Sequence, residues 1–277
     1  MMKLQGARTV IIGGGGGMGA AIARRLGGFG AQVIVADIDL ASAEAVAQEI
    51  QSMTSGAKAR AVATDLAVGA DLDRLFAVAS EWLGGRVELL VNHAGVAVGG
   101  PAEAIPDVEW DRVFHTNVTG FAGSIRRFLP LMGGDDESWI VNTSSAMGLF
   151  HDQPAAGPYI ASKAAIIAMS RALALQLSRR NIGVSVLCPE LTDTAFPASA
   201  KRYPLDAQPS QRSGGTPPHA QSPDQAALAL IQGLEAGKFL ISLAPSTRER
   251  LILMAEAELA PRSDRPDRPS TQTSSNS

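Results

Sequence analysis

Residues 9–19 of the chain read TVIIGGGGGMG, and this stretch decides the fold. The β-branched run before Gly13 is typical of a buried strand, and the apolar residues after Gly17 begin a helix. Glycines between a strand and a helix let the backbone approach a pyrophosphate, which the free N–H groups of the helix N-terminus then bind. We therefore interpret the stretch as a dinucleotide-binding turn and not as a flexible linker. No Gly-Lys-Ser/Thr follows, so the sequence excludes a P-loop nucleotidase.

An acidic side chain, Asp37, follows the next expected strand. A carboxylate at this place can accept hydrogen bonds from an adenosine ribose, and it would repel a 2′-phosphate. Neither Lys nor Arg occupies residues 14–16 or the position after Asp37, which is Ile38. The alternative is a helix N-cap, because Asp37 and Asp39 both precede a helix. We assign the ribose role to Asp37 and the capping role to Asp39, and so predict NAD rather than NADP.

Outward from this stretch, strand-like and helix-like segments alternate along the chain. The expected strands lie at about 9–12, 33–36, 59–63, 88–91, 139–142, 183–187 and 238–242. The expected helices lie at about 17–29, 41–53, 71–82, 107–132, 159–180 and 223–235. Strict alternation predicts an α/β fold: a doubly wound parallel sheet, Rossmann-like, in a single domain with helices on both faces.

Two segments break the alternation. Residues 190–222 are rich in proline and lack periodicity, and we interpret them as a substrate lid within a dinucleotide-binding domain that spans 1–260. Residues 261–277 contain no large apolar residue, so we expect a disordered tail that activity does not need. The lid predicts an apolar or aromatic substrate through three of its residues: Phe196, Tyr203 and Leu205.

The composition of the 277-residue chain narrows the function classes. A formal net charge of -3 argues against nucleic acid or an anionic membrane as a partner. The single cysteine, Cys188, allows no intrachain disulfide, and the four histidines lack the spacing of metal ligands. No apolar signal region opens the chain, and no run approaches the roughly 18 apolar residues of a membrane span. We expect a cytoplasmic protein with no metal site.

Tyr159 and Lys163 are four residues apart within one expected helix. This spacing places both side chains on one face of the helix. A free phenol titrates near pH ~10, and a nearby ammonium lowers that pKa, so the pair can move a proton to or from an alcohol or a carbonyl. The spacing alone is weak evidence, since a Tyr packed on a Lys stem gives the same pattern.

Further motifs, in a fixed order, support the catalytic interpretation of this pair. The glycine pattern G-x-x-x-G-x-G precedes Thr64-Asp65-Leu66, Asn92-His93-Ala94-Gly95, Asn117, Ser145, and Cys188-Pro189 with Thr194. In this order the motifs resemble those of the short-chain dehydrogenase/reductases, in the compact branch of that family, over about residues 6–243. The resemblance implies a Rossmann-type fold and hydride transfer between a nicotinamide cofactor and an alcohol or ketone.

The resemblance also implies the site residues. The implied cofactor-binding residues are Gly13, Gly17, Met18, Gly19, Asp37, Asp65, Leu66, Asn92, Ala94, Gly95, Tyr159, Lys163, Pro189, Thr192 and Thr194. The implied catalytic residues are Ser145, Tyr159, Lys163 and Asn117. Tyr159 would exchange the proton, and Ser145 would hold the substrate oxygen. Lys163 would lower the pKa of Tyr159 and bond the nicotinamide ribose. Asn117 would position a water that connects Lys163 to solvent. The neighbouring Ser144 is expected to be structural, because strand alternation turns it the other way.

Three residues depart from the family pattern. Ile12 stands where the family usually has Thr, His93 replaces the second Asn, and Glu190 replaces the Gly after Pro189. Glu190 would add a carboxylate near the nicotinamide end, and a solvent-facing loop residue is the equally open alternative. Of the remaining histidines, His151 could reach the substrate mouth, whereas His115 is expected to pack or to cap.

These observations predict an NAD-dependent alcohol dehydrogenase or carbonyl reductase acting on a small molecule. Two alternatives remain: a non-catalytic dinucleotide-sensing module, and a lyase or isomerase on the same scaffold. Intact Ser145, Tyr159 and Lys163 argue against the sensor, because a pure sensor needs none of them. Glu190 is the one hint of a lyase or isomerase.

We also expect a homo-oligomer, either a tetramer or a dimer. A helix that is apolar on more than one face is usually buried on more than one side. The resemblance implies that the long helix at 107–132 is its partner. The expected helix at 159–180 carries an apolar stripe at Ile166, Met169, Leu173 and Leu177, with Ile167 and Leu175 lying off it.

Overall fold

The computed structural model describes the chain except for residues 1, 151–154, 204–219, 245 and 260–277. The chain divides into two units, Met1–Ala244 and Pro245–Ser277. The described part of the second unit is helix α10 (Thr247–Leu259). The first unit therefore ends at Ala244, earlier than the predicted domain end at 260. The predicted tail at 261–277 lies outside the described residues.

A seven-stranded parallel sheet forms the centre of the first unit, in the order β3-β2-β1-β4-β6-β7-β9. The chain winds outward from β1 in one direction to β3 and then from β4 in the other direction to β9, which confirms the predicted doubly wound fold. The strands are β1 (Arg8–Ile12), β2 (Gln32–Asp37), β3 (Lys58–Ala63), β4 (Leu89–Asn92), β6 (Ser138–Thr143), β7 (Ile182–Cys188) and β9 (Leu240–Ser242).

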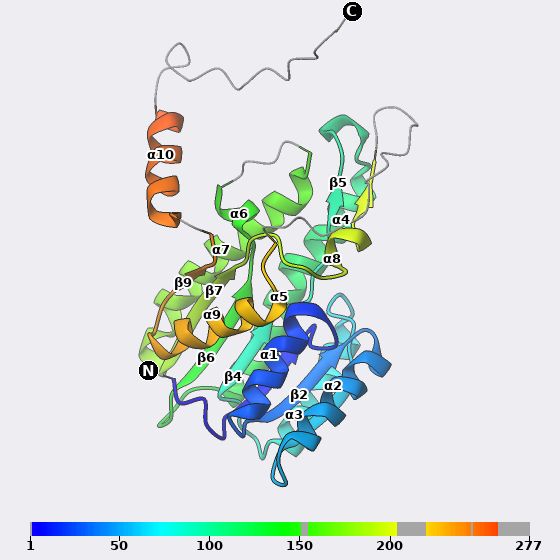
Figure 1. Ribbon diagram of the computed structural model, residues 1–277, viewed down its shortest axis with the longest axis vertical. Helices are drawn as coiled ribbons and strands as arrows, with labels where there is room; N and C mark the ends of the chain where they lie inside the picture. Colours follow the sequence, from blue (N-terminus) through cyan, green and yellow to red (C-terminus); the bar gives the residue numbers. More distant parts are fainter. Residues whose placement is uncertain (1, 151–154, 204–219, 245, 260–277) are drawn as a thin grey trace, which may run out of the picture. The chain divides into compact units, whose positions relative to one another are not determined.

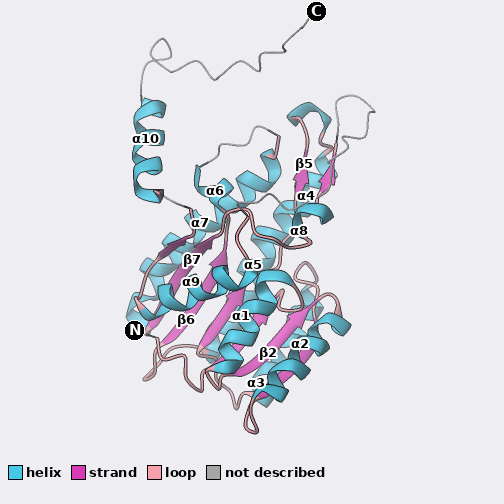
Figure 2. Ribbon diagram, in the orientation of Figure 1, coloured by secondary structure: helices cyan, strands magenta, loops and turns pink. Residues whose placement is uncertain are grey.

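Helices cover both faces of this sheet (Figures 1 and 2). One face carries α1 (Gly17–Gly28), α2 (Leu40–Met53) and α9 (Pro223–Glu235), whose buried side chains share one apolar core. The other face carries α3 (Gly69–Trp82), α5 (Gly120–Phe128) and α7 (Gly157–Leu177), whose buried side chains share a second core.

Strand β1 shows why its sequence forms a central strand. Successive side chains of a strand point to opposite faces, so a strand covered on both faces needs apolar residues throughout. Val10 and Ile12 enter the core beneath α3, α5 and α7, whereas Ile11 enters the core beneath α1, α2 and α9. All three side chains are fully buried. The β-branched run at residues 9–12 is therefore the centre of the molecule.

The long helix predicted at 107–132 is interrupted in the structure. Helix α4 (Asp107–Phe114) passes into a π-helical turn (His115–Thr119), then into α5, and a 3-10 turn (Leu129–Leu131) ends it. A π turn inserts one extra residue and often occurs at functional sites. Here it carries Asn117, whose side chain bonds the backbone of Val96, a contact that periodicity cannot reveal.

Part of the predicted lid is regular structure. A short helix, α8 (Phe196–Ser199), leads to strand β8 (Lys201–Arg202), which pairs in parallel with β5 (Val98–Gly99) in a separate two-stranded sheet. Two other short elements were also not predicted, namely α6 (Ala146–Phe150) and a 3-10 turn (Ala102–Ala104). Residues 204–219 of the lid, which include Leu205, lie outside the described residues.

Helix α7 and the 3-10 turn that follows it are long and apolar enough to cross a membrane, over Gly157–Arg180. This criterion rests on length and composition only, so the expectation of no membrane partner stays a prediction. These criteria are also met by core helices of soluble proteins, and 33% of the window is buried. Because α7 packs on β7 and buries the charged Lys163, we assign it to the core of this unit.

Candidate active site

The glycine turn between β1 and α1 cannot accept side chains at most of its positions. Gly13 and Gly17 have φ of +90° and +50°, in the region that favours glycine. A Cβ on Gly13 would lie 2.5 Å from the nitrogen of Ala94, and one on Gly19 would lie 1.9 Å from the Gly13 carbonyl oxygen. Gly16, which precedes α1, has open space where a side chain would stand. The turn therefore offers bare backbone at a helix N-terminus, which fits a pyrophosphate.

Asp37 lies beside this turn at the carboxyl end of β2. Its carboxylate accepts hydrogen bonds from the backbone N–H of Gly15 at 2.8 Å and of Asp39 at 3.1 Å. Asp39 caps α2 by accepting from Ala41 and Ser42, which confirms its predicted role. Asp37 is thus separate from the cap, and its carboxylate is held next to the glycine turn where a ribose would lie.

Asp65 and Leu66 follow β3 but serve their own loop. The Asp65 carboxylate accepts from the N–H of Ala67 at 2.8 Å, and its own N–H donates to Asp71 at 2.9 Å. Leu66 is buried and packs against Gly120 of α5. The Leu66 side chain therefore belongs to the core, and a contact with adenine would fall to the Asp65 carboxylate or to the backbone.

Asn92, at the end of β4, belongs to a buried polar network. Its amide nitrogen donates to the Asn142 side chain of β6 at 2.8 Å, and its oxygen accepts from Ser124 of α5. Asn142 in turn donates to Ser170 of α7 at 3.0 Å. The Asn92 side chain thus joins strands and helices, so the predicted cofactor contact would have to come from its backbone.

Ala94 and Gly95 line the opposite side of the turn from Asp37. The N–H of Ala94 donates to the carbonyl of Ile12 at 2.8 Å, which holds the segment after β4 against the glycine turn. A Cβ on Gly95 would lie 3.1 Å from Asn117 Oδ1 and 3.4 Å from Lys163 Nζ. Gly95 therefore sits between two predicted catalytic residues, where a side chain would be crowded.

The Asn117 side chain is almost fully engaged. Its amide group donates to the Val96 carbonyl at 2.9 Å and to Ser162 Oγ at 3.0 Å, and Oδ1 accepts from the Val96 N–H at 2.8 Å. Both amide protons are used, and Oδ1 can accept one more bond. Asn117 therefore fastens the segment after β4 to α7, and a water in the predicted relay could only donate to Oδ1.

Tyr159, Lys163 and Ser145 come together as predicted, at the carboxyl end of the sheet. The Tyr159 hydroxyl is hydrogen-bonded to Ser145, which directly precedes α6. Lys163 Nζ donates to the carbonyl of Thr143 at 2.9 Å and lies 5.6 Å from the centre of the Tyr159 ring. Ser144 points the other way and donates to the Lys163 carbonyl at 2.7 Å, which agrees with its predicted structural role.

Burial dominates the protonation of this group. It raises the pKa of Tyr159 to about 12, against the opposing hydrogen bond from Ser145. It lowers the pKa of Lys163 to about 8. The predicted lowering of the Tyr159 pKa by Lys163 is not found, because the ammonium lies beside the ring and bonds a backbone carbonyl. Burial also raises the pKa of Cys188, at the end of β7, to about 11.

The segment after β7 closes on the glycine turn. The Pro189 carbonyl accepts from the N–H of Ala146 at 2.9 Å, and Thr192 Oγ1 donates to the Glu190 carbonyl at 3.0 Å. A Cβ on Gly17 would lie 3.0 Å from the methyl carbon of Thr194. The structure thus brings the first and last predicted cofactor motifs into contact. It assigns no chemical role to the Glu190 carboxylate.

Two of the four histidines, His93 and His115, lie among the residues that the structure describes. His93 Nδ1 lies 3.1 Å from Thr143 Oγ1, and burial, with Lys163 nearby, lowers the pKa of His93 to about 4. His115 is exposed, and its Nε2 lies 2.9 Å from the Ala67 carbonyl. His151 and His219 lie outside the described residues. Among the residues that the structure describes, no group of His, Cys, Asp or Glu could hold a metal ion.

Sequence reasoning missed Glu109, a buried carboxylate near the lid. Its pairing with Arg112, three residues on, was readable as a helical ion pair. Its bonds to Lys201 and Tyr203 were not readable, because these partners are distant in sequence.

A glycine turn next to a Ser–Tyr–Lys group, at the switch point of a doubly wound sheet, is the arrangement of an oxidoreductase. The family model described as short chain dehydrogenase matches residues 7–203. The chain belongs to this family.

Individual relatives agree with this assignment. The chain is 30% identical to a CLA biosynthesis dehydrogenase/reductase from Lactiplantibacillus plantarum, over 84% of this chain and 77% of that one. It is 32% identical to a 2,5-dichloro-2,5-cyclohexadiene-1,4-diol dehydrogenase from Sphingobium indicum, over 76% and 82%. A short chain dehydrogenase/reductase from Burkholderia phymatum, solved in complex with NAD, superimposes with a TM-score of 0.80 at 28% identity, covering 93% and 96%.

Proposed function

We propose that the protein is an NAD(H)-dependent dehydrogenase or reductase that interconverts a secondary alcohol and a ketone of apolar or aromatic character. The observation that carries the proposal is the hydrogen bond between the Tyr159 hydroxyl and Ser145, with Lys163 against the Tyr159 ring. A hydroxyl pair of this kind can bind one carbonyl or alcohol oxygen and exchange its proton.

The residues of this group supply the proton chemistry. In reduction, Ser145 donates a hydrogen bond to the carbonyl oxygen and Tyr159 gives that oxygen its proton as it becomes an alcohol. In oxidation the same proton returns to Tyr159. The hydrogen bond from Ser145 opposes the rise in the pKa of Tyr159 and so stabilises the phenolate that forms. Lys163 titrates near 8 and is therefore mostly charged at neutral pH. A bound nicotinamide would supply or accept the hydride.

Cofactor choice is proposed from Asp37, and substrate character from Phe196. The carboxylate of Asp37 can accept bonds from two ribose hydroxyls and would repel a 2′-phosphate. The ring of Phe196 lies 5.9 Å from the ring of Tyr159, so the oxygen-binding group has an apolar neighbour. The related structure solved with NAD supports the choice of cofactor. The relative named as a 2,5-dichloro-2,5-cyclohexadiene-1,4-diol dehydrogenase supports the apolar character of the substrate.

A screen for NADH formation with a panel of cyclic, aromatic and linear secondary alcohols tests the proposal. We expect NAD-dependent oxidation, fastest with the larger apolar alcohols, and reduction of the matching ketones. NADH binding without any turnover would favour the sensing module. A non-redox conversion of a hydroxylated substrate would favour the lyase or isomerase.

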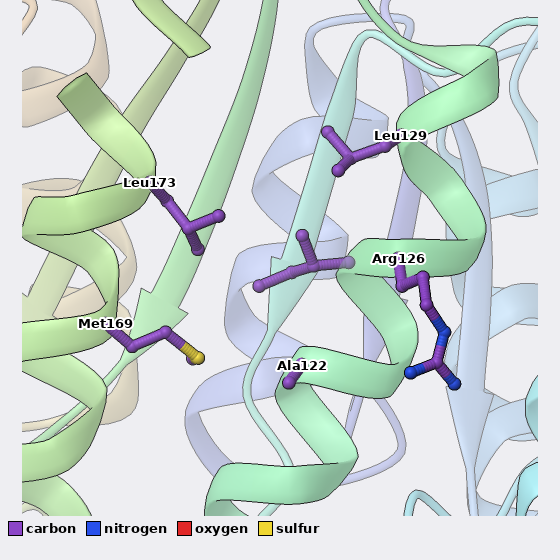
Figure 3. Close-up of a pocket in the computed structure, with 6 residues that line it drawn as sticks. Ala122, Arg126, Leu129, Met169 and Leu173 are labelled. Carbon is purple, nitrogen blue, oxygen red and sulfur yellow. The ribbon is translucent and has the colours of Figure 1, made fainter. Parts of the chain in front are cut away.

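We further propose a cytoplasmic homo-oligomer assembled through α5 and α7. A groove of about 190 Å³ lies between these helices, and its lining is almost wholly apolar (Figure 3). Leu175, on the same helix, is 82% exposed. Exposed apolar surface of this kind is typical of protein interfaces. The groove is lined by Ala122, Ile125, Arg126, Leu129, Met169 and Leu173.

A further inference from the structure

Glu109 is a charged side chain buried near the rim of the site. It lies on α4 and is 3% exposed, although glutamates are rarely buried unless they are paired. One carboxylate oxygen accepts from Arg112 Nε at 2.6 Å. The other accepts from the Lys201 ammonium and from the Tyr203 hydroxyl, the latter at 3.1 Å. These donors lower the pKa of Glu109 to about 2, so it stays ionised at neutral pH.

The two lid partners of Glu109 are held at their backbone as well. Strand β8 pairs with β5, and the N–H of Tyr203 donates to the Gly99 carbonyl at 2.9 Å. A Cβ on Gly100 would lie 2.4 Å from the Tyr203 carbonyl oxygen, so the two backbones approach closely. Gly100 also forms a parallel bridge with Ala156, directly before α7. The bonds from Glu109 to Lys201 and Tyr203, called the clamp below, are therefore joined through Gly100 to the helix that carries Tyr159.

Phe196 connects this clamp to the reacting group. It opens α8, the four-residue helix that leads to β8, so the place of β8 limits where Phe196 can lie. Figure 1 shows α4, β5 and α8 together beyond the carboxyl ends of the strands. A small apolar cluster of Val98, Ile105, Val113, Trp110 and Tyr203 supports the same region.

We propose that Glu109 is a positioning residue that holds Phe196 against Tyr159 through Lys201 and Tyr203, and so forms the apolar wall of the substrate mouth. The inference rests on the proposed function, because it takes Tyr159 as the proton-transferring group. The wall covers the apolar body of an alcohol or ketone and takes no part in proton exchange. Loss of the clamp therefore weakens substrate binding without slowing the chemistry of bound substrate.

Steady-state kinetics of Glu109→Gln test this role with an alcohol from the panel. We expect KM to rise about tenfold, the lower end of what one apolar contact contributes to discrimination, with kcat within about twofold. Glu49→Gln is the matched control, because Glu49 is ion-paired with Arg24 away from the lid. NADH affinity should be unchanged in both variants. An unchanged KM in Glu109→Gln, or an equal loss of NADH affinity, overturns the proposal.

A double-mutant cycle shows whether Glu109 acts through Phe196. Phe196→Ala alone should raise KM by a similar factor, and the double variant should be no worse than Phe196→Ala. If the two effects multiply, Glu109 does not act through Phe196 and the proposal fails. Lys201→Met gives an independent test should Glu109→Gln fold poorly, since the Lys201 side chain is 60% exposed. It should show the same change in KM as Glu109→Gln.

Hydrogen exchange separates this inference from the proposed function, because it needs no turnover. The amides of Phe196 and Tyr203 are bonded to Thr194 and Gly99. We expect both to exchange faster in Glu109→Gln or Lys201→Met, with no change along β1. Faster exchange in a protein that oxidises no alcohol would uphold the clamp and reject the enzyme. Unchanged exchange would reject the clamp, whatever the activity.

Discussion

Tyr159 holds its proton tightly in this structure. Burial raises its pKa to about 12, so the phenol is neutral at physiological pH and is ready to donate a proton to a carbonyl oxygen. Proton removal from an alcohol needs the phenolate, which the hydrogen bond from Ser145 stabilises. Lys163, whose ammonium lies 5.6 Å from the centre of the Tyr159 ring, loses its charge as the pH rises through about 8. The protonation of Tyr159 therefore favours reduction at neutral pH.

Replacing Tyr159 by Phe should abolish turnover and keep NADH binding. The change removes only the hydroxyl, and general acid–base groups typically contribute ~10²–10⁴-fold. Turnover by absorbance and NADH affinity by calorimetry measure the two effects separately. Turnover near that of the unmodified protein would show that another group transfers the proton.

Replacing His93 by Asn should reduce the loss of folding stability that occurs as the pH falls. The unfolded histidine titrates near 6.5 and the folded one near 4, so the unfolded chain binds more protons between these values. Stability attributable to His93 is therefore complete above pH 6.5 and is lost as pH falls toward 4. At ~1.4 kcal/mol per pKa unit, the full loss over this range is about 3.5 kcal/mol, of which about 2 kcal/mol falls between pH 7 and pH 5. Urea unfolding at pH 7 and pH 5 measures it, and an equal loss in both proteins would contradict this account.

At the scale of elements, the glycine turn and the end of β2 form one unit for cofactor selection. Gly15 donates to Asp37, and a Cβ on Gly15 would lie 2.9 Å from the Asp37 carboxyl carbon. The absence of a side chain at Gly15 therefore lets the carboxylate stand beside the turn. Ile38, directly after it, is 71% exposed and leaves room for a substituent.

NAD should be preferred over NADP by a factor of roughly 10² or more in kcat/KM, a few kcal/mol at ~1.4 per tenfold. Asp37→Ala should reduce the preference for NAD over NADP, mainly by weakening the binding of NAD. Adding Ile38→Arg should reduce this preference further by providing a partner for the 2′-phosphate. Steady-state kinetics with NAD and with NADP measure this preference in each protein. Equal kcat/KM with the two cofactors in the unmodified protein would mean that Asp37 only orders the turn.

The elements that sequence predicts best are those with a strong local signal. Residues 9–12 lie in β1, and the helix predicted at 223–235 has the observed bounds, with Ser222 in a capping box with Gln225. Helix α10 was overlooked although its Leu, Met, Ala and Glu residues favour a helix. Strand β8 has no such signal, because Lys201 and Arg202 become a strand only by pairing with β5.

The site residues also fall into those that the sequence predicts and those that it does not. Spacing within one helix and an ordered set of motifs predict that Tyr159, Lys163 and Ser145 meet. They do not reveal which side chains are already engaged within the protein. Asn92 and Asn117 are held by partners from other elements. Glu109 is bonded by Lys201, which lies 92 residues further along the chain. Such contacts depend on the tertiary fold and leave no local pattern.

At the scale of the whole molecule, α7 packs against the sheet, carries Tyr159 and Lys163 of the site, and lines the groove beside α5. We expect light scattering to give a mass that is a multiple of 28.8 kDa. Met169→Glu with Leu173→Glu should shift it to the monomer, because carboxylates cannot be buried unpaired in an apolar interface. Met53→Glu, at an exposed residue of α2, is the matched control. A monomeric mass for the unmodified protein would contradict the proposal.

The single cysteine gives the molecule a built-in chemical reporter. Thiol reagents attack the thiolate, and Cys188 is buried with a pKa near 11, so the native protein should react slowly. Labelling must wait for the end of β7 to open, and its rate therefore records how often that happens. A dinucleotide bound beside β7 should slow labelling in proportion to its occupancy. Cofactor affinity could then be titrated by a colour reaction before any substrate is identified.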